Sequence, residues 1–298
     1  MKHVPWTEIK LFHNLLISLK KYGADLGIDI TKPVTYRAKV KLHGTCAGVV
    51  VEKNGNVSYQ SRERIITPED DNAGFARWAS SIPFSKLVQE DYNVVVCGEW
   101  AGSGIQKSVA VSQIGKKIFA VFALLFVDDD GKVVRSEFEP EMISYWAPWA
   151  ENIRHSDVLV LPWYKNDYSV TISFSSEASV LEDVVKGINE EVAAVENCDP
   201  FIKDNFGIEG LGEGLVYYPV HNSVDIDYDM FSNLVFKAKG EKHQTVKSSK
   251  PAQVDPSIAA SANDFAALVL TGARLAQGAD TVGNSFDCLL YTSDAADE

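Results

Sequence analysis

The feature that most constrains the fold is a series of short β-type runs that are joined by turns instead of helices. Three such runs lie at residues 34–41, 47–52 and 57–60, and two longer apolar runs lie at residues 93–100 and 118–127. Continuous apolar runs of this length are typical of buried strands. Strands without regular βαβ alternation favour an α+β fold with antiparallel sheets over a doubly wound fold.

Turn and helix signals extend this assignment. Asn54-Gly55 predicts a tight hairpin, because both central positions of such a turn favour positive φ. Further strands are expected at residues 132–136, 214–218 and 233–239. The spacing of apolar residues predicts helices over residues 7–22, with Thr7 as the cap, and over 69–80, 139–150 and 176–196.

The amino-acid composition of the chain changes after Lys239. We expect a first domain over residues 1–243, a polar linker over 244–256, and the start of an incomplete helical C-terminal domain over 257–287. Residues 288–298, CLLYTSDAADE, match the translation of a sequencing-library adapter, with an ordinary acidic tail as the alternative. The adapter interpretation implies a gene from a metagenomic fragment, and a natural protein that continues past Asp287.

Charge and composition narrow the class of protein. The formal net charge is −13, which argues against a simple nucleic-acid binder unless a local basic groove exists, and five lysines fall between residues 237 and 250. The longest apolar run is too short for a membrane span of ~20 residues, and no signal peptide is evident. The four cysteines lack metal-like spacing. We therefore expect a cytoplasmic monomer with reduced thiols and no membrane association.

Five short elements stand in order along the chain. Each is weak alone, since a KxxG sequence arises by chance in many proteins. They are Lys41-Leu42-His43-Gly44, Ser61-Arg62, Gly98-Glu99-Trp100, Phe119-Ala120-Val121-Phe122, and Glu213-Gly214 followed by Lys237-Ala238-Lys239.

Taken together, these elements resemble the covalent nucleotidyltransferases, which comprise polynucleotide ligases and mRNA capping enzymes. DNA ligases and capping enzymes usually have KxDG where this chain has His43. The segments KLHGT, GEWAGSGIQK, KIFAVF, EGLVYYP and FKAK are most similar to the RNA ligase 2 family, which includes phage enzymes. The resemblance covers about residues 30–240 and implies that residues 1–243 form a nucleotidyltransferase (adenylation) domain of antiparallel sheets with flanking helices.

The resemblance also implies the catalytic residues. Lys41 is expected to attack the α-phosphate of ATP and to carry AMP, and His43 is expected to assist at the phosphates. Lys237 and Lys239 are expected to bind the α-phosphate. Two residues apart on one strand, they project from the same face. Their positive charge would favour the neutral, nucleophilic amine of Lys41, because like charges disfavour protonation.

Other residues are expected to bind the nucleotide and a metal ion. By resemblance, Arg62 binds the nucleotide or the RNA end, Phe119 stacks on adenine, and Glu99 contacts the ribose. Glu213 is expected to bind Mg²⁺ or Mn²⁺, with Glu99 as a second carboxylate available to the metal. The expected activity is ATP-dependent joining of RNA 3′-hydroxyl and 5′-phosphate ends through lysyl-AMP and AMP–RNA. The partner would be a nicked duplex RNA or an RNA–DNA hybrid.

Two residues depart from the family pattern, and two other functions stay open. Cys46 stands where the family commonly has asparagine, and Tyr218 stands where it usually has lysine. One phosphate-facing cation is therefore missing, which bears on RNA-end recognition more than on the lysine chemistry. One alternative is a DNA ligase or a capping-type nucleotidyltransferase. The other is a nucleotide- or RNA-binding module without turnover.

Overall fold

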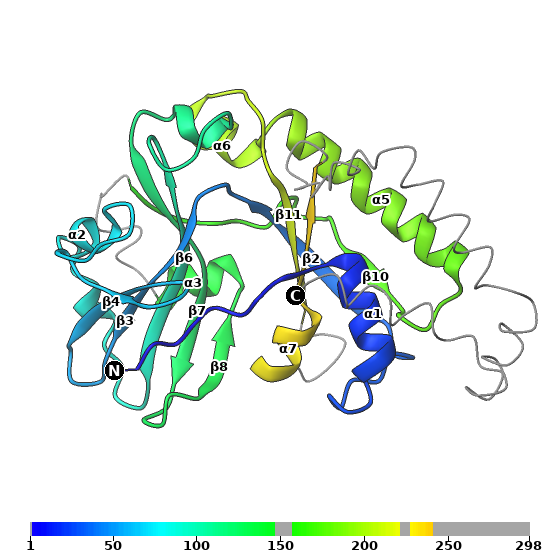
Figure 1. Cartoon of the computed structure of the whole chain (residues 1–298), viewed down its shortest axis with the longest axis horizontal. Coiled ribbons are helices and arrows are strands. Elements are labelled where there is room, and N and C mark those ends of the chain that lie inside the picture. The colour runs from blue at the N-terminus through cyan, green and yellow to red at the C-terminus, as the bar shows by residue number, and fades with distance from the viewer. Residues whose placement is uncertain (1, 147–156, 221–226, 241–298) are drawn as a thin grey trace, which may run out of the picture. The chain divides into compact units, whose positions relative to one another are not determined.

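Two β-sheets lie next to each other, and helices cover their outer faces (Figure 1). The computed structural model describes residues 2–146, 157–220 and 227–240, which belong to one unit. The expected linker, helical C-terminal segment and adapter-encoded tail lie outside the described residues. None of the described helices is both long and apolar enough to cross a membrane.

The first sheet is built from strands distant in sequence. Among the described residues it has five strands, in the order β1 (Lys10–Leu11), β12 (Phe236–Lys239), β11 (Gly214–Pro219), β2 (Val34–Lys41) and β10 (Val170–Ile172). All neighbours are antiparallel except β1 and β12.

The second sheet is built mostly from strands consecutive in sequence. Its described strands are, in order, β5 (Ile65–Ile66), β4 (Val57–Ser61), β3 (Thr45–Val51), β6 (Asn93–Gly102), β7 (Lys117–Val127) and β8 (Val133–Glu137), with β9 (Val158–Val160) parallel to β7. The predicted hairpin between β3 and β4 is confirmed. Gly55 has a φ of 84°, but Asn54 is not among the residues with positive φ, so the turn is not of the expected two-residue type.

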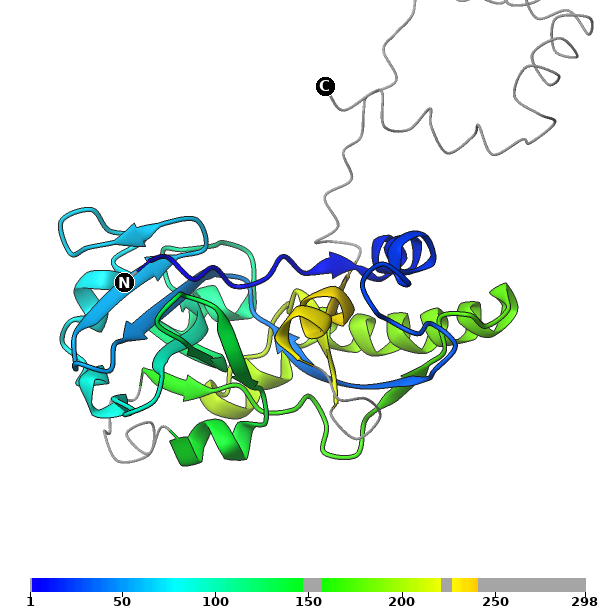
Figure 2. The ribbon, with the colours of Figure 1, turned by 90° about the horizontal axis from the view of Figure 1, so that it is seen from below.

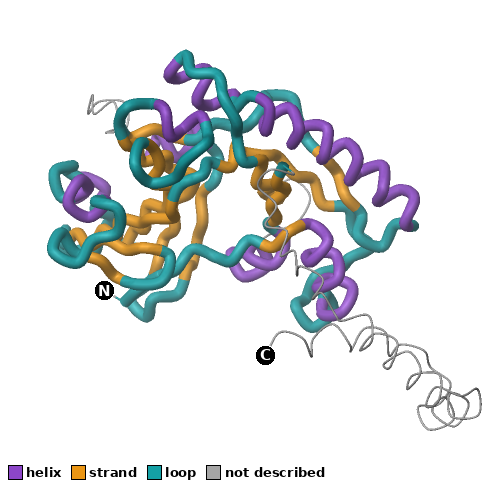
Figure 3. Tube along the Cα trace, turned by 45° about the horizontal axis from the view of Figure 1, so that its top comes forward, coloured by secondary structure: helices purple, strands orange, loops and turns teal. Residues whose placement is uncertain are grey.

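Helices pack on both sheets. The described helices are α1 (Phe12–Tyr22), α2 (Phe75–Ala79), α3 (Pro140–Trp146), α5 (Ala178–Asn197), α6 (Pro200–Phe206) and α7 (Tyr228–Leu234), with short 3₁₀ helices η1 (Phe84–Leu87) and η2 (Ala110–Gln113). Helix α5 contacts β10, β11 and β12, whereas α3 contacts β7 and β9. Figure 3 shows the helices in purple around the orange strands.

Two hydrophobic cores result from this arrangement. The larger core lies between the sheets and under α1 and α5, and in it the rings of Tyr217 and Phe236 stack at 4.7 Å. The smaller core lies on the other face of the second sheet, where Phe75 and Phe84 pack with Phe119. The α+β assignment and the mostly antiparallel sheets predicted from sequence are confirmed.

The structure corrects several element boundaries. The first helix begins at Phe12 and not at Thr7, because the backbone of Lys10 and Leu11 pairs with β12. Helix α2 is shorter than the predicted span, since Ala73 and Gly74 have positive φ and break the helical path. The expected strand over residues 233–239 begins at Phe236. The last part of the predicted helix over 139–150 lies outside the described residues.

The N-terminal segment, residues 2–9, connects the two sheets. Figure 2 shows it in dark blue, passing from the strands of the second sheet to α1. Val4 exchanges two hydrogen bonds with the buried Gln60 side chain, at 3.1 and 2.5 Å. The ring of Trp6 packs on Phe122 of β7 at 4.9 Å. The segment is therefore attached to the second sheet, and β1, which follows it in the chain, belongs to the first sheet.

Candidate active site

A cavity of about 580 Å³ is lined by residues of both sheets. The N-terminal segment and the turn after β4 also contribute to its wall. The charged side chains that line the cavity are Lys41, Arg62, Glu63, Arg64, Glu99, Lys237 and Lys239. Five of these residues were predicted from the sequence as site residues. Glu213 is a sixth, because it lies beside the cavity in contact with Lys41 and Lys239.

Lys41 is the last residue of β2 and forms an ion pair with Glu213. Its Nζ lies 2.7 Å from Glu213 Oε2. The strand register causes this contact, because Lys41 lies opposite Gly214, the residue after Glu213. Gly214 has a φ of 146°, and a Cβ there would lie 2.2 Å from the carbonyl oxygen of Ala238. Only glycine therefore allows the close strand approach that places Glu213 beside Lys41.

Glu213 accepts hydrogen bonds from three cationic or polar side chains. Besides Lys41, His43 Nδ1 lies 3.1 Å from Oε2 and Lys239 Nζ lies 2.8 Å from Oε1. Burial by itself would raise the pKa of Glu213, whose side chain is 1% exposed. The hydrogen bond from His43, the charge of Lys41 and the bonds from both lysines outweigh burial and hold this pKa well below its ordinary value. Because an ionised carboxylate only accepts, His43 carries its proton on Nδ1.

Lys237 and Arg62 are the cations available to a ligand. Lys237 projects from the same face of β12 as Lys239, as predicted. Burial, together with the charges of Lys239, Lys41 and Arg62, lowers the pKa of Lys237. Within the described residues, neither Lys237 nor Arg62 forms a side-chain hydrogen bond or ion pair. A cluster of positive charge with two unpaired members is suited to a polyanion such as a triphosphate.

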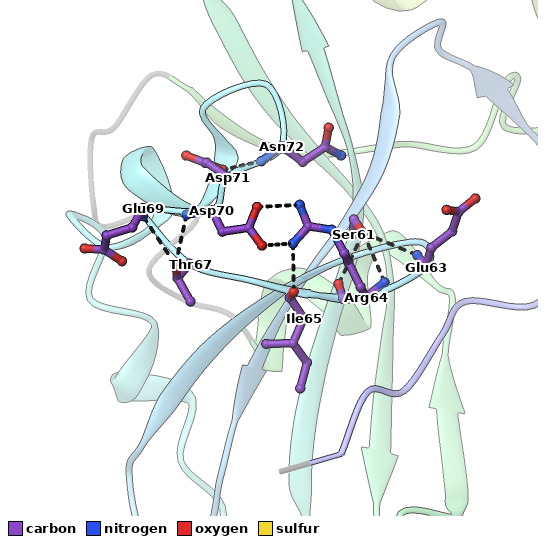
Figure 4. Close-up of polar contacts among 9 residues, drawn as sticks. All are labelled: Ser61, Glu63, Arg64, Ile65, Thr67, Glu69, Asp70, Asp71 and Asn72. Carbon is purple, nitrogen blue, oxygen red and sulfur yellow. Dashed lines mark hydrogen bonds and ion pairs between the residues drawn. The ribbon is translucent and has the colours of Figure 1, made fainter.

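The turn that carries Arg62 is held in place by its neighbours (Figure 4). Ser61 Oγ accepts the backbone N–H of Glu63 at 3.3 Å and that of Arg64 at 3.2 Å. The guanidinium of Arg64 donates two hydrogen bonds to the carboxylate of Asp70, at 2.5 and 2.9 Å. Arg64 also lines the cavity, and the motif analysis did not single it out.

Glu99 and Gln106 fix the turn that follows Lys41. Glu99 Oε1 accepts the backbone N–H of Gly44 at 2.9 Å, and Gln106 donates to the carbonyl of Gly44 at 3.4 Å. Burial raises the pKa of Glu99 to about 7, against the opposing charge of Lys41. The charge of Glu213 raises the pKa of Glu99 further, so the two carboxylates influence each other.

The structure places Phe119 away from the cavity. Its side chain is 0% exposed and packs in the smaller core against Phe75 and Trp78. Phe122, the last residue of the same motif, lines the cavity instead. Ordinary alternation along β7 explains the difference, because side chains three residues apart on a strand project from opposite faces of the sheet. A β-bulge follows: Cys97 pairs with Ala123 but Gly98 pairs with Val121, which leaves Phe122 without a partner on β6.

The two departures from the family pattern both lie in the cavity wall. Cys46 is opposite Glu99 in the β3–β6 ladder, and burial raises the pKa of its thiol to about 12. Tyr218 lies on β11 with only 3% of its surface exposed. Sequence reasoning missed Trp6, Thr7 and Ile9, which line the cavity from the N-terminal segment.

The donor atoms present are compatible with a shared metal ion. The described residues contain no group of three or more His, Cys, Asp or Glu side chains arranged to hold a metal alone. Mg²⁺ is usually bound by one or two carboxylates together with substrate phosphates. Glu99 and Glu213 supply two carboxylates beside the cluster of cations, which fits that kind of site.

Comparison with models of known protein families shows to which family the chain belongs. A family model described as RNA ligase matches residues 34–239, which is more than half of the chain.

The chain belongs to the RNA ligase family.

The match over residues 34–239 begins at β2 and ends at Lys239, so it contains Lys41, Glu99, Glu213 and both lysines of β12. The family resemblance inferred from the motifs is therefore confirmed. No curated protein sequence matches this chain.

Solved structures of an RNA ligase from Naegleria gruberi are similar to this chain. An apo mutant has a TM-score of 0.48 and 16% identity, and the similarity covers 80% of this chain and 57% of that one. A mutant with ATP and Mn has a TM-score of 0.48 and 15% identity, covering 82% and 58%. The enzyme with PPi has a TM-score of 0.48 and 16% identity, covering 80% and 56%. The matched region thus spans less than two thirds of the length of those structures.

Proposed function

We propose that this member of the RNA ligase family uses ATP to join an RNA 3′-hydroxyl to a 5′-phosphate through lysyl-AMP and AMP–RNA. The observation that carries the proposal is the position of Lys41. Its amine lies at the wall of the cavity, and Lys237, Lys239 and Arg62 line the same cavity. A nucleophile surrounded by cations suits attack on a phosphoryl group, whose negative charge the cations stabilise.

In the first step the ammonium of Lys41, ion-paired with Glu213, gives one proton to solvent, and the neutral amine attacks the α-phosphorus of ATP. An Nζ–P bond forms, the bond from the α-phosphorus to the bridging oxygen breaks, and pyrophosphate leaves with that electron pair. The nitrogen gives a second proton to solvent as the phosphoramide forms. Glu213 holds Lys41 and Lys239 in place at 2.7 and 2.8 Å, so the nucleophile is positioned before ATP binds.

The following two steps transfer AMP and then release it. A 5′-phosphate oxygen of the RNA attacks the lysyl-AMP phosphorus, so that the Nζ–P bond breaks and Lys41 regains a proton. A 3′-hydroxyl then attacks the 5′-phosphorus of AMP–RNA and expels AMP, which leaves a phosphodiester. His43 contacts the same oxygen of Glu213 as Lys41, which is consistent with an assisting role near the phosphates.

The remaining wall of the cavity fits the nucleoside. Phe122 presents an aromatic ring at the cavity, and we transfer to it the adenine-stacking role expected of Phe119. Glu99 lies on β6, the strand next to the β7 strand of this ring, and is suited to a ribose hydroxyl. A divalent ion, Mg²⁺ or Mn²⁺, held by Glu213 and Glu99 together with the phosphates would supply charge neutralisation.

The RNA substrate follows from the same chemistry. We propose that the ends are presented by a nicked duplex RNA or an RNA–DNA hybrid, because a nick places the 3′-hydroxyl beside the 5′-phosphate. Arg62, on the exposed turn after β4, is the cation placed to contact the phosphate backbone or the 5′ end.

Incubation with [α-³²P]ATP and a divalent cation, followed by a denaturing gel, tests the first step. We expect an acid-labile labelled protein band that is lost in Lys41→Ala and retained in the control Lys20→Ala, which changes an exposed lysine of α1. Label transferred from GTP instead would favour a capping-type enzyme. A protein that binds ATP but gives no band would favour a binding module without turnover.

A substrate panel tests the later steps. Nicked duplexes in which each strand is RNA or DNA should be sealed best when the 3′-hydroxyl end is RNA. Preferential sealing of all-DNA nicks would favour the DNA ligase alternative over the RNA ligase that we propose.

A further inference from the structure

Lys39 is a buried lysine that the proposed reaction does not use. It lies on β2 two residues before Lys41, and its side chain is 1% exposed. Its Nζ donates a hydrogen bond to the carbonyl oxygen of Phe122 at 2.9 Å. The same ammonium lies 5.0 Å from the ring of Trp163 and 5.4 Å from the ring of Tyr218. Among the described residues, Lys39 forms no ion pair within 4.0 Å.

The bulge in β7 explains why this carbonyl is free to accept. Phe122 has no partner on β6, because the register shifts between Cys97 and Gly98. On its other side, β9 pairs with β7 only as far as Val121, and β8 pairs from Leu124 onward. Phe122 therefore lies outside the ladders on both sides. A buried carbonyl without a donor would be costly, and the Lys39 ammonium supplies the donor.

A lysine at this position is unfavourable for stability. Burial lowers the pKa of Lys39 to about 7, and the positive charge of Arg37 on the same strand acts in the same direction. Glu139, Glu137 and Glu141 partly oppose this effect, but none of them forms an ion pair with Lys39. An apolar side chain of similar length would fill the space without the cost of desolvating a cation. The retained cation thus points to a role other than filling the core.

We propose that Lys39 is a positioning residue that fixes the bulge of β7 and thereby holds the Phe122 ring at the cavity wall for stacking on the nucleobase of ATP. The ring is held from its other side by Trp6, at 4.9 Å. Lys39 does not line the cavity itself, and Phe122 is the lining residue with which it forms a hydrogen bond. This inference rests on the proposed use of ATP.

The test compares Lys39→Met with Arg37→Met. The guanidinium of Arg37 packs on the Trp163 ring at 4.6 Å, and Lys39 contacts the same ring. Arg37 does not contact the Phe122 carbonyl. Single-turnover formation of the labelled adduct is measured over a range of ATP concentrations. Lys39→Met is expected to raise the half-saturating ATP concentration about tenfold and to leave the rate at saturation within about threefold, since base stacking contributes to binding. Arg37→Met should change neither value.

Two further measurements separate positioning from general damage. Inhibition by tripolyphosphate, which has no base, should be the same in wild type and Lys39→Met, because Lys237 and Arg62 are unchanged. Lys39→Arg, which keeps the cation and its donors, should restore most of the ATP affinity. If Lys39→Met does not fold, Lys39→Gln provides the same comparison without the charge.

The outcomes distinguish this inference from the proposed function. An unchanged half-saturating concentration in Lys39→Met, or an equal loss of tripolyphosphate inhibition, would overturn the role of Lys39 while the ligase assignment stands. Absence of any labelled adduct in the wild-type protein would overturn both.

Discussion

Glu213 and Lys41 form a 2.7 Å ion pair across two adjacent strands. Gly214 lies opposite Lys41 in one ladder and opposite Lys239 in the other, so the residue before it lies between two lysines from different parts of the chain. One buried carboxylate therefore organises the cations of the cavity before any ligand is present.

Replacing Glu213 with Gln should remove a pH-dependent part of the stability. The pKa of Glu213 is depressed in the folded protein, so its contribution is present above the unfolded value of about 4.5 and is lost as pH falls below it. We expect the unfolding free energy of wild type to fall by about 1–2 kcal/mol more than that of Glu213→Gln between pH 5 and pH 3, with allowance for the partial exposure of Lys41 and Lys239. Urea unfolding at several pH values measures this, and parallel curves would contradict it.

Glu99 should make the unfolding free energy depend on pH in the opposite direction, and Glu99→Gln should remove this dependence. The pKa of Glu99 is raised to about 7, so the folded state keeps a proton between about pH 4.5 and pH 7 that the unfolded chain releases. Wild-type stability should fall as pH rises through this window, and the variant should lack that slope because Gln keeps the acceptor for Gly44 without ionising. Urea unfolding at pH 4, 6 and 8 tests this, with Glu90→Gln as a control at an exposed carboxylate.

Lys237→Ala and Lys239→Ala should both slow adenylylation but differ in stability. Loss of a contact to the α-phosphate should reduce the single-turnover rate by about 30- to 1000-fold, equivalent to ~2–4 kcal/mol. Lys239→Ala should also destabilise the fold, because Glu213 loses a partner, whereas Lys237 has no ion pair to lose within the described residues. Thermal unfolding beside the rate measurement separates the two effects. Equal stability losses would show that Lys237 is also structural.

Phe122→Ala and Phe119→Ala should have different consequences. Phe119→Ala removes a fully buried ring and should cost about 3–5 kcal/mol in unfolding free energy, without a selective loss of ATP binding. Phe122→Ala should weaken ATP binding about tenfold, because stacking on one base contributes ~1–3 kcal/mol. Urea unfolding and ATP titration of both variants decide between the rings. ATP binding that depends on Phe119 instead would restore the role expected from the motif.

Local signals predicted the strands and most of the motif residues that come together at the cavity. The run from Val34 to Lys41 is a strand with the predicted bounds, and the apolar runs at 93–100 and 118–127 pair as neighbours. These predictions succeeded because burial on both faces leaves a continuous apolar run in the sequence. The motif residues converge because each lies at a strand end or turn that the registers bring to one edge.

Non-local pairing accounts for what the sequence analysis missed. The apolar spacing from Ile9 onward indicates a helix, but Lys10 and Leu11 are extended because they pair with β12. Phe119 and Phe122 project from opposite faces of β7, and both faces are buried, so the apolar run does not reveal which face meets the cavity. The three contacts of Glu213 depend on the registers of β2 and β12 with β11, and no local motif specifies a register.

The pairing of β1 with β12 has a consequence for how the protein is made. Lys10 meets Phe236, so on the order of 200 residues must be synthesised and collapsed before the two strands meet. Trp6 and Lys237, which line the same cavity, belong to the two ends of that loop. The nascent chain on the ribosome therefore has no complete cavity until β12 has emerged, and a ligand of the cavity can bind only after β1 and β12 have paired.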